Sequence, residues 1–400
     1  MSIQNTSFRM IAQTQFGLEE VLRTELLKLG ARDLQRHNRA VSFTGDQGFL
    51  YKANLCLRTA IRVLVPIETF GMRSTEEMYF GIGRIPWEEY LGPEDTLAIR
   101  CTLNTPYLDH SQYAAQKAKD AIVDRLRERF GARPSVDRED PTLRIQLHVI
   151  GDQCHVSLDS SGTSLHERGY RTDTDLAPIN EVLAAGMVQL TGWDRRSPLV
   201  DPMCGSGTIA IEAALLAGNI PPGVFRKGFG FQRWKDYDAD LYSTIHNAAL
   251  ARISDEKPII IAGERAGLVV EKARANVLNA QLEDAIELRH SAFEQLEAPG
   301  RRGVLIINPP YGERMDHLGH EKDAQAEEIN AFYKTLGDTL KKRWAGWQAW
   351  VITSNLEAAK HIKLTPKPRI QLFNGALDCR FMRYEMYEGS RRLEPRPSSN

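Results

Sequence analysis

The chain has 400 residues, of which 42% are hydrophobic, and its 51 basic and 52 acidic side chains leave a net charge of -1. This length predicts two or three domains, and because the net charge gives no sign of a nucleic-acid partner, such a partner would need local basic faces. No apolar stretch approaches the roughly 20 residues that span a bilayer and the polar N-terminus lacks a signal peptide's apolar run, so we expect a cytoplasmic protein with no membrane partner.

The five cysteines are scattered and form no C-x-x-C pair. Free thiols in a reducing compartment are therefore expected, with no structural zinc. The histidines are unclustered, so no metal site is predicted. Nothing in the sequence indicates the oligomeric state.

The first seventy residues alternate between strand and helix patterns. Apolar residues at helical spacing predict a helix over 17–29, which Gly30 closes. A second helix is predicted over 47–57, and strands are predicted at 8–14, 31–37, 40–43 and 59–68. The order β-α-β-β-α-β is that of a ferredoxin-like layer of sheet and helices.

A second α+β segment follows this layer. Strands are predicted at 96–103, 143–149 and 154–159, the last two as a hairpin, with a long helix over 111–130. Lysines and arginines on this helix suit phosphate contacts, but acids at salt-bridge spacing are at least as compatible with a solvated face. A linker is expected over 160–177.

From residue 178 the pattern changes to repeated strand–helix units. Strands are predicted at 199–201, 258–263, 285–290, 303–307, 348–353, 369–373 and 379–387, and helices at 179–190, 208–217, 268–280, 326–343 and 356–361. Strands separated by helices imply a mostly parallel, doubly wound, Rossmann-like α/β sheet. The last two strands follow each other closely, which predicts an antiparallel hairpin at one edge.

A glycine turn follows the apolar strand that ends in Asp201. It reads Met203-Cys204-Gly205-Ser206-Gly207 and leads into a helix that starts near Thr208. Glycines at 205 and 207 let the backbone approach a ligand without side-chain clash, and the helix N-terminus points at that ligand. This context predicts a nucleotide-type pocket at the carboxyl end of a parallel strand; a plain strand-to-helix turn is the alternative. Cys204 has no assignable partner base, so we interpret it as a small residue tolerated in a tight loop.

Glu264 ends the next predicted strand, where an acid commonly accepts hydrogen bonds from ribose hydroxyls. A solvated loop acid is the alternative. The spacing from Asp201 is long because residues 218–257 form an insertion. The insertion contains an aromatic-rich stretch at 229–234, for which packing is favoured over base stacking.

The sequence Asn308-Pro309-Pro310-Tyr311 stands at the end of a later apolar run. The carboxamide oxygen of Asn308 and the carbonyl of Pro309 can each accept one hydrogen of a planar exocyclic amine, which draws electron density onto its nitrogen. The two prolines stiffen the loop, and Tyr311 can stack on the base. With the glycine turn, this motif predicts methyl transfer from S-adenosylmethionine to a base amine by in-line displacement, driven by positioning.

The chain resembles the class I RNA methyltransferases that carry an N-terminal THUMP region, more narrowly the bacterial enzymes that make N2-methylguanosine in 23S ribosomal RNA. The resemblance runs from residue 8 to about residue 387, and four stretches carry it: 165–171, 177–181, 201–208 and 308–314. It implies a ferredoxin-like domain over 1–70, an RNA-docking THUMP domain over 71–165 and a Rossmann-like catalytic domain over 166–388. Residues 389–400 are then expected to form a flexible tail.

Site residues follow from the same resemblance. The target-base residues are Asn308, Pro309, Pro310 and Tyr311. The expected cofactor-binding residues are Asp201, Met203, Cys204, Gly205, Gly207, Thr208, Glu264, Arg265, Ala292, Phe293 and Asn308. The chain departs from many relatives at Ala266, where they carry a second acid, and at 291–293, where they carry an acid that contacts adenine. Some relatives are fusions with a second methyltransferase, whereas a chain of about 400 residues would carry one activity.

Three hypotheses follow. The first is guanine-N2 methylation of structured RNA, either 23S rRNA or a ribosome assembly precursor. The second is adenine-N6 methylation of RNA or DNA, which the same loop serves equally well. The third is a non-catalytic RNA-binding assembly factor, supported only by the departures at Ala266 and Ala292.

Overall fold

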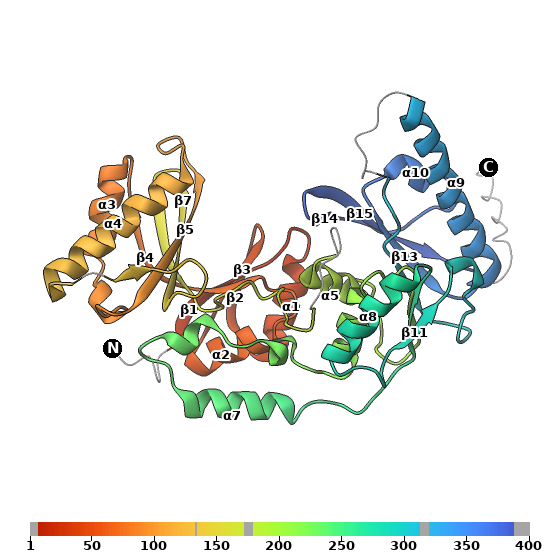
Figure 1. The fold of residues 1–400 in the computed structure, drawn as a ribbon, viewed down its shortest axis with the longest axis horizontal. Coiled ribbons are helices and arrows are strands. Elements are labelled where there is room, and N and C mark those ends of the chain that lie inside the picture. The colour runs from red at the N-terminus through yellow and green to blue at the C-terminus, as the bar shows by residue number, and fades with distance from the viewer. Residues whose placement is uncertain (1–6, 133, 172–178, 313–319, 388–400) are drawn as a thin grey trace, which may run out of the picture. The chain divides into compact units, whose positions relative to one another are not determined.

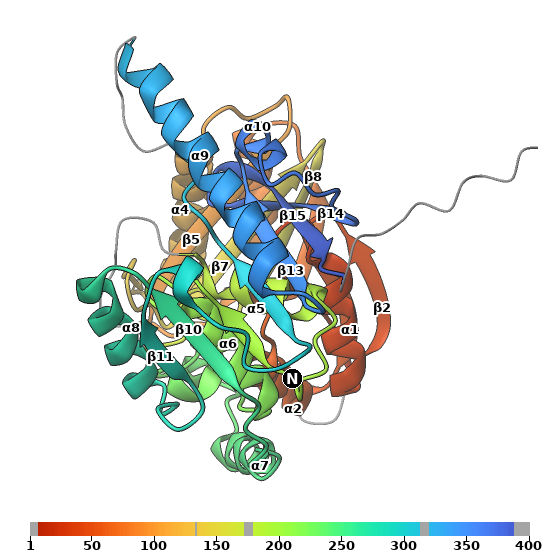
Figure 2. The same cartoon turned by 90° about the vertical axis from the view of Figure 1, so that its right-hand side faces the viewer.

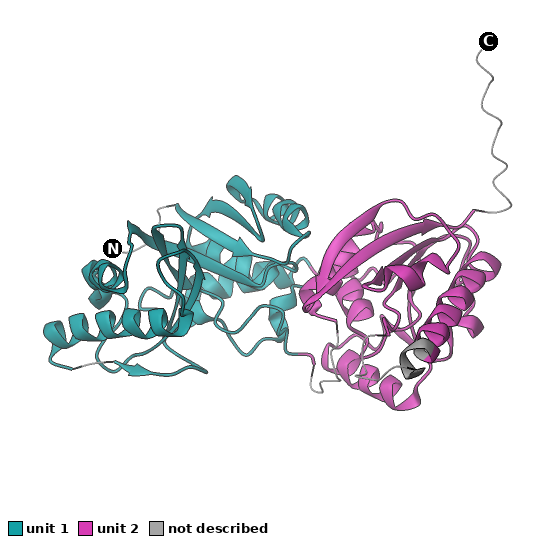
Figure 3. Cartoon of the chain, turned by 90° about the horizontal axis from the view of Figure 1, so that it is seen from above, with its two compact units in different colours: residues 1–169, 221–252 teal, residues 170–220, 253–400 magenta. Residues whose placement is uncertain are grey.

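The structure is a computed structural model that describes residues 7–132, 134–171, 179–312 and 320–387 (Figure 1). The predicted tail, 389–400, lies outside these residues, as do residues 177–178 and 313–314 of the quoted stretches. The chain forms two compact units (Figure 3). Unit 1 comprises residues 1–169 and 221–252, and unit 2 comprises residues 170–220 and 253–400.

Unit 1 begins with the predicted β-α-β-β-α-β order, which the structure confirms. The elements are β1 (Phe8–Gln13), α1 (Glu19–Leu29), β2 (Arg32–His37), β3 (Ala40–Gly45), α2 (Gln47–Cys56) and β4 (Arg62–Gly71). Helix α1 ends at Gly30, whose φ of 100° is the left-handed conformation that favours glycine. Helix α2 begins after Asp46, whose carboxylate accepts a hydrogen bond from the Phe49 amide at 2.7 Å.

The second α+β segment adds to the same sheet. Its elements are α3 (Thr75–Arg84), η1 (Trp87–Glu89), β5 (Thr96–Asn104), α4 (Ser111–Phe130), β6 (Ser135–Val136), β7 (Leu143–Ile150) and β8 (Gln153–Asp159). The sheet order is β2-β3-β1-β4-β8-β7-β5-β6, so β4 pairs with both β1 and β8. The sequence did not predict this shared strand, because pairing partners are chosen by tertiary contacts and not by local pattern.

Helix α3 was also absent from the sequence prediction. Gly81 and Gly83 lower its helix propensity. The structure needs a glycine at 81, because a Cβ there would lie 2.2 Å from the Phe70 ring. A usable signal was Ser74, which accepts a hydrogen bond from the Glu77 amide at 3.2 Å and so caps the helix.

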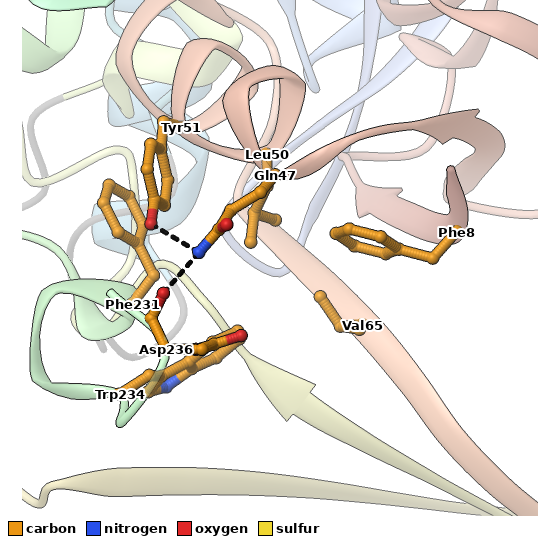
Figure 4. A pocket seen from close by; sticks show the side chains of 8 residues that line it. All are labelled: Phe8, Gln47, Leu50, Tyr51, Val65, Phe231, Trp234 and Asp236. Atoms are coloured by element: carbon orange, nitrogen blue, oxygen red, sulfur yellow. Dashed lines mark hydrogen bonds between the residues drawn. The ribbon is translucent and has the colours of Figure 1, made fainter. Parts of the chain in front are cut away.

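Residues 221–252 leave unit 2 and pack within unit 1. They form η2 (Pro222–Phe225), η3 (Gly230–Arg233) and α7 (Ala239–Leu250). Phe231 is 1% exposed and stacks on Tyr51 with ring centroids 4.4 Å apart, and Gln47 donates hydrogen bonds to the Tyr51 hydroxyl and the Asp236 carbonyl (Figure 4). The cavity here measures only about 10 Å³. The aromatic stretch is therefore packing, and no base can stack on the buried Phe231.

Unit 2 is a seven-stranded sheet with the order β11-β10-β9-β12-β13-β15-β14. Its strands are β9 (Leu199–Asp201), β10 (Ile260–Glu264), β11 (Glu287–His290), β12 (Val304–Ile307), β13 (Gln348–Thr353), β14 (Arg369–Asn374) and β15 (Leu377–Glu385). The first five are parallel, whereas β15 runs antiparallel to both β13 and β14. The predicted doubly wound sheet with an antiparallel edge hairpin is confirmed.

Helices connect these strands. They are α5 (Glu181–Leu190), α6 (Thr208–Ala217), α8 (Gly267–Asn279), η4 (Phe293–Gln295), α9 (His320–Arg343) and α10 (Leu356–Lys360). Helix α6 packs on β9 and β10, and α8 packs on β10 and β11 (Figure 2). Tyr333 and Leu336 of α9 share a core with Leu305 and Ile307, alternate residues of β12. Among the described residues, no helix is long and apolar enough to cross a membrane.

Candidate active site

The predicted site residues follow neighbouring parallel strands of unit 2. Strand β9 lies between β10 and β12, and the chain order reverses at this point. In open α/β sheets, ligands bind in the crevice outside the carboxyl ends of the strands at such a reversal. Asp201 ends β9, Glu264 ends β10, and Asn308 directly follows β12.

The turn after β9 has the backbone geometry that its glycines predict. Gly205 has φ of 53° and Gly207 has φ of 84°. A Cβ on Gly205 would meet nothing within 4 Å, so the backbone conformation, and not crowding, requires glycine there. The Cys204 amide donates to the Gly263 carbonyl at 2.9 Å, which joins the turn to β10.

Two carboxylates meet beside this turn. Glu264 accepts hydrogen bonds from the Gly205 amide at 3.2 Å and from the Ala266 amide at 3.0 Å. Asp201 is fully buried; its Oδ1 accepts from the Met203 amide at 3.4 Å, and its Oδ2 has no partner among the described residues. Burial, reinforced by the nearby Glu264 charge, raises the pKa of Asp201 to about 8. A buried carboxyl oxygen without a partner fits a ligand that brings a cation or a donor to this point.

Cys204 is buried in the same turn. Burial raises the pKa of its thiol well above the ordinary value, and the charges of Asp201 and Glu264 add to this effect. The thiol therefore stays protonated near neutral pH, which fits the interpretation of Cys204 as a small loop residue and not a nucleophile.

The residues expected to contact adenine lie around the end of β11. The Ser291 amide donates to the Glu264 carbonyl at 3.0 Å, and His290 Nε2 lies 3.1 Å from the Arg265 carbonyl oxygen. The Phe293 ring is buried against Trp344, at a centroid distance of 6.0 Å. Ala292 and Phe293 thus offer backbone groups, since neither side chain can accept a hydrogen bond.

Sequence reasoning missed the residues that support the glycine turn. Arg171 donates to the Thr208 hydroxyl at 2.7 Å and lies 3.3 Å from the Glu181 carboxylate. Asn276 of α8 donates to the Ser206 carbonyl at 3.0 Å. Arg171 lies in a stretch that carried the family resemblance, whereas Asn276 gave no local signal because its partner is seventy residues away.

The loop of Asn308 to Tyr311, predicted to bind the target base, is held at three points. The Tyr333 hydroxyl donates to the Pro310 carbonyl at 3.4 Å, and Asn355 Nδ2 donates to the Tyr311 carbonyl at 3.0 Å. The Tyr311 hydroxyl donates to Asn308 Oδ1 at 2.7 Å. Within the described residues, no donor reaches the Pro309 carbonyl.

The basic helix α4 lies in unit 1. Arg125 makes a two-pronged contact with Glu88 at 2.8 and 2.7 Å, and this contact holds the pKa of Glu88 to about 2. Lys119 pairs with Asp120 at 2.7 Å, and Arg127 pairs with Asp124 at 2.9 Å. Much of the positive charge on α4 is therefore already matched by acids, as the solvated-face interpretation requires.

Known proteins match the chain over almost its whole length. Residues 9–64 match the model of an RlmL ferredoxin-like domain, 72–159 that of a THUMP domain and 168–383 that of an RMKL-like methyltransferase domain. A candidate RNA methyltransferase of Synechocystis sp. is 40% identical over 372 residues, which cover 93% of this chain and 95% of that protein.

A ribosomal RNA large subunit methyltransferase K/L of Syntrophotalea carbinolica is 38% identical over 391 residues, 95% of this chain and 54% of that protein. The chain thus spans about half the length of such K/L relatives. The crystal structure of SMU.472, a candidate methyltransferase complexed with SAH, is 30% identical with a TM-score of 0.84, and the match covers 96% of this chain and 100% of that one.

Proposed function

Because the chain belongs to the RMKL-like family of methyltransferases, we propose that it methylates the exocyclic N2 amine of a guanosine in large-subunit ribosomal RNA by direct in-line transfer. The cofactor is S-adenosylmethionine, as the family and the SAH-bound neighbour imply. When bound, it supplies an electrophilic methyl group on a sulfonium. The guanine base and the 23S molecule follow from the family resemblance in the sequence.

The residues around the glycine turn fit this cofactor. Asp201 Oδ2, which has no partner among the described residues, suits a positively charged group, because an opposite charge favours the ionised carboxyl. Glu264 accepts one backbone hydrogen bond at each oxygen and keeps further lone pairs for ribose hydroxyls. Gly205 and Gly207 bring the backbone close without a side chain in the way.

One observation carries the proposed reaction: the target-base loop keeps two acceptors available. Tyr333 and Asn355 occupy the carbonyls of Pro310 and Tyr311, whereas the Pro309 carbonyl has no donor among the described residues. Asn308 Oδ1 accepts one hydrogen bond from Tyr311 and has a second lone pair.

The Pro309 carbonyl, which no donor reaches among the described residues, and the second lone pair of Asn308 Oδ1 match the two hydrogens of an aromatic amine. Hydrogen bonds to both hydrogens draw electron density onto the nitrogen and fix its orientation, so that its lone pair can attack the methyl carbon. The carbon–nitrogen bond would form as the carbon–sulfur bond breaks with its electron pair on sulfur, and the methylated nitrogen would then release one of its two protons to water. No covalent nucleophile is required, in agreement with the protonated thiol of Cys204.

The open face of the sheet in unit 1 supports an RNA partner. Arg100 of β5 is exposed, and Arg144 and His148 lie on the same face of the neighbouring β7, with His155 opposite His148 on β8. Asp159, the acid at the end of β8 on the same face, is buried and accepts a hydrogen bond from Arg62. Burial, and to a smaller extent His155, lower the pKa of His148, so the cations of this face are Arg100 and Arg144. No exposed acid stands at the matching positions of β5, β7 and β8, which suits phosphate contacts better than α4 does.

Methyl transfer from labelled S-adenosylmethionine to unmodified 23S rRNA tests the proposal. After digestion to nucleosides, we expect the label in N2-methylguanosine. Label in N6-methyladenosine would overturn the base and keep the cofactor site. Cofactor binding without any transfer to RNA would favour a non-catalytic role or another partner.

A further inference from the structure

The tip of the β14–β15 hairpin reaches the target-base loop. We propose that Asn374, at this tip, is a positioning residue that directs the single hydroxyl proton of Tyr311 onto the carboxamide oxygen of Asn308. This inference rests on the proposed function, in which the Asn308 carboxamide oxygen accepts a hydrogen bond from the target amine. It assigns a role to a side chain that lies about sixty residues after the loop in the sequence. It also gives the Tyr311 hydroxyl a role, whereas stacking would use only the ring.

Strand pairing places Asn374 beside the loop. It is the last residue of β14 and pairs with Leu377 across a two-residue turn, in which Gly375 has φ of 63°. Strand β15 runs antiparallel to β13, and their pairing ends at Thr353 with Arg380. The hairpin therefore continues past the carboxyl end of β13, the edge at which the site lies. Asn374 shares a strand face with the buried Leu372.

The hydrogen-bond chain has one direction. Asn374 Nδ2 lies 3.3 Å from the Tyr311 hydroxyl oxygen, and an amide nitrogen can only donate. The hydroxyl accepts this bond and donates its one proton to Asn308 Oδ1 at 2.7 Å. The Cys379 side chain also forms a hydrogen bond with Tyr311, and with that proton on Asn308 the thiol must be the donor. Burial raises the pKa of Tyr311, and the neighbouring Cys379 adds to this effect, so the Tyr311 hydroxyl keeps its proton at neutral pH.

The consequence is an acceptor whose orientation is fixed. With one lone pair of Asn308 Oδ1 bound to Tyr311, the carboxamide cannot rotate its nitrogen toward the substrate amine. Its remaining lone pair and the Pro309 carbonyl then present two acceptors together. Stacking by Tyr311 needs only its ring, whereas this role needs its hydroxyl.

Two substitutions of different size separate the role from simple packing. Asn374→Ala removes the donor that orients the Tyr311 hydroxyl, so its proton is no longer held on Asn308 and kcat should fall about 2- to 5-fold. Asn374→Asp keeps the volume and the hairpin turn, but its carboxylate accepts only and attracts the Tyr311 proton. We expect kcat of Asn374→Asp to be about 2- to 10-fold below that of Asn374→Ala, with KM for RNA and cofactor affinity unchanged.

If Asn374 only filled space, the order would reverse, because Asp is nearly isosteric with Asn and Ala is not. That order, or equal values, overturns the inference. In the Tyr311→Phe background, the difference between the Asp and Ala variants should vanish; its persistence would also overturn it. Gln371→Ala is the matched control, since Gln371 lies on the same hairpin and donates to Asp378 at 3.0 Å.

The test is separable from the proposed function. Rates are compared on whichever nucleoside the wild type methylates, so an adenosine product overturns the guanosine assignment and leaves the ratio measurable. A second readout needs no turnover: in protein with labelled asparagine side chains, Tyr311→Phe should shift the amide resonances of both Asn308 and Asn374. If neither resonance shifts, the inference is wrong.

Discussion

Replacing Asp201 by Asn should remove most of the pH dependence of cofactor binding. In the free protein, burial raises the pKa of Asp201 to about 8, so the carboxyl is protonated at neutral pH. S-adenosylmethionine is a cation, and a cation bound near this carboxyl favours the ionised form. Binding then releases a proton, and the affinity rises with pH until the free carboxyl is itself ionised.

The magnitude follows from the fraction of Asp201 already ionised. With a pKa of about 8, that fraction is roughly 1% at pH 6, 9% at pH 7 and one half at pH 8. If the bound-state pKa lies below 6, Kd should fall about tenfold from pH 6 to 7 and about fivefold from pH 7 to 8, and should level off above pH 9.

Isothermal titration calorimetry in two buffers of different ionisation enthalpy measures both Kd and the released proton. Asp201→Asn carries no titratable group at this position and keeps the size of the side chain, so it corrects for titration of the ligand's own amino group. Equal slopes of log Kd against pH in the variant and the wild type would refute the reasoning.

Three further predictions concern the acceptor, a helix start and a core contact. Asn308→Ala should lower kcat by about 10²- to 10³-fold in single-turnover assays with cofactor Kd unchanged; wild-type transfer would contradict the loop assignment. Ala266→Asp should stabilise the protein by about 0.5–2 kcal/mol in thermal melts, because α8 starts at Ala266 without a side-chain cap; a lower melting temperature would mean that repulsion from Glu264 wins. Phe231→Ala should cost about 3–5 kcal/mol in urea unfolding of unit 1, since Phe231 is buried against Tyr51; an unchanged midpoint would exclude that packing role.

The similarity to known proteins confirms the family and the fold class that the sequence indicated. The ferredoxin-like, THUMP and methyltransferase models match in the predicted order. The exact domain boundaries and the individual site residues remain predictions. Residues 221–252, inside the predicted catalytic range, pack in unit 1 instead.

Features that depend on local chemistry could be predicted from the sequence alone. The spacing of apolar residues in strands and helices follows from which residues face the core. This spacing therefore predicted the β-α-β-β-α-β order and the parallel strands. The turn at Gly205 and Gly207 and the Asn308–Tyr311 loop were also visible, because each is a short stretch whose backbone demands particular residues.

Only the tertiary structure decided which distant groups meet. Strand β4 joins two predicted layers into one sheet, Asn276 holds the glycine turn, and Asn374 contacts Tyr311 from sixty-three residues away. Asparagine is common in turns for purely local reasons, so nothing at position 374 marks a partner. Hydrogen bonds between segments depend on register and packing, which the sequence encodes only through the whole fold.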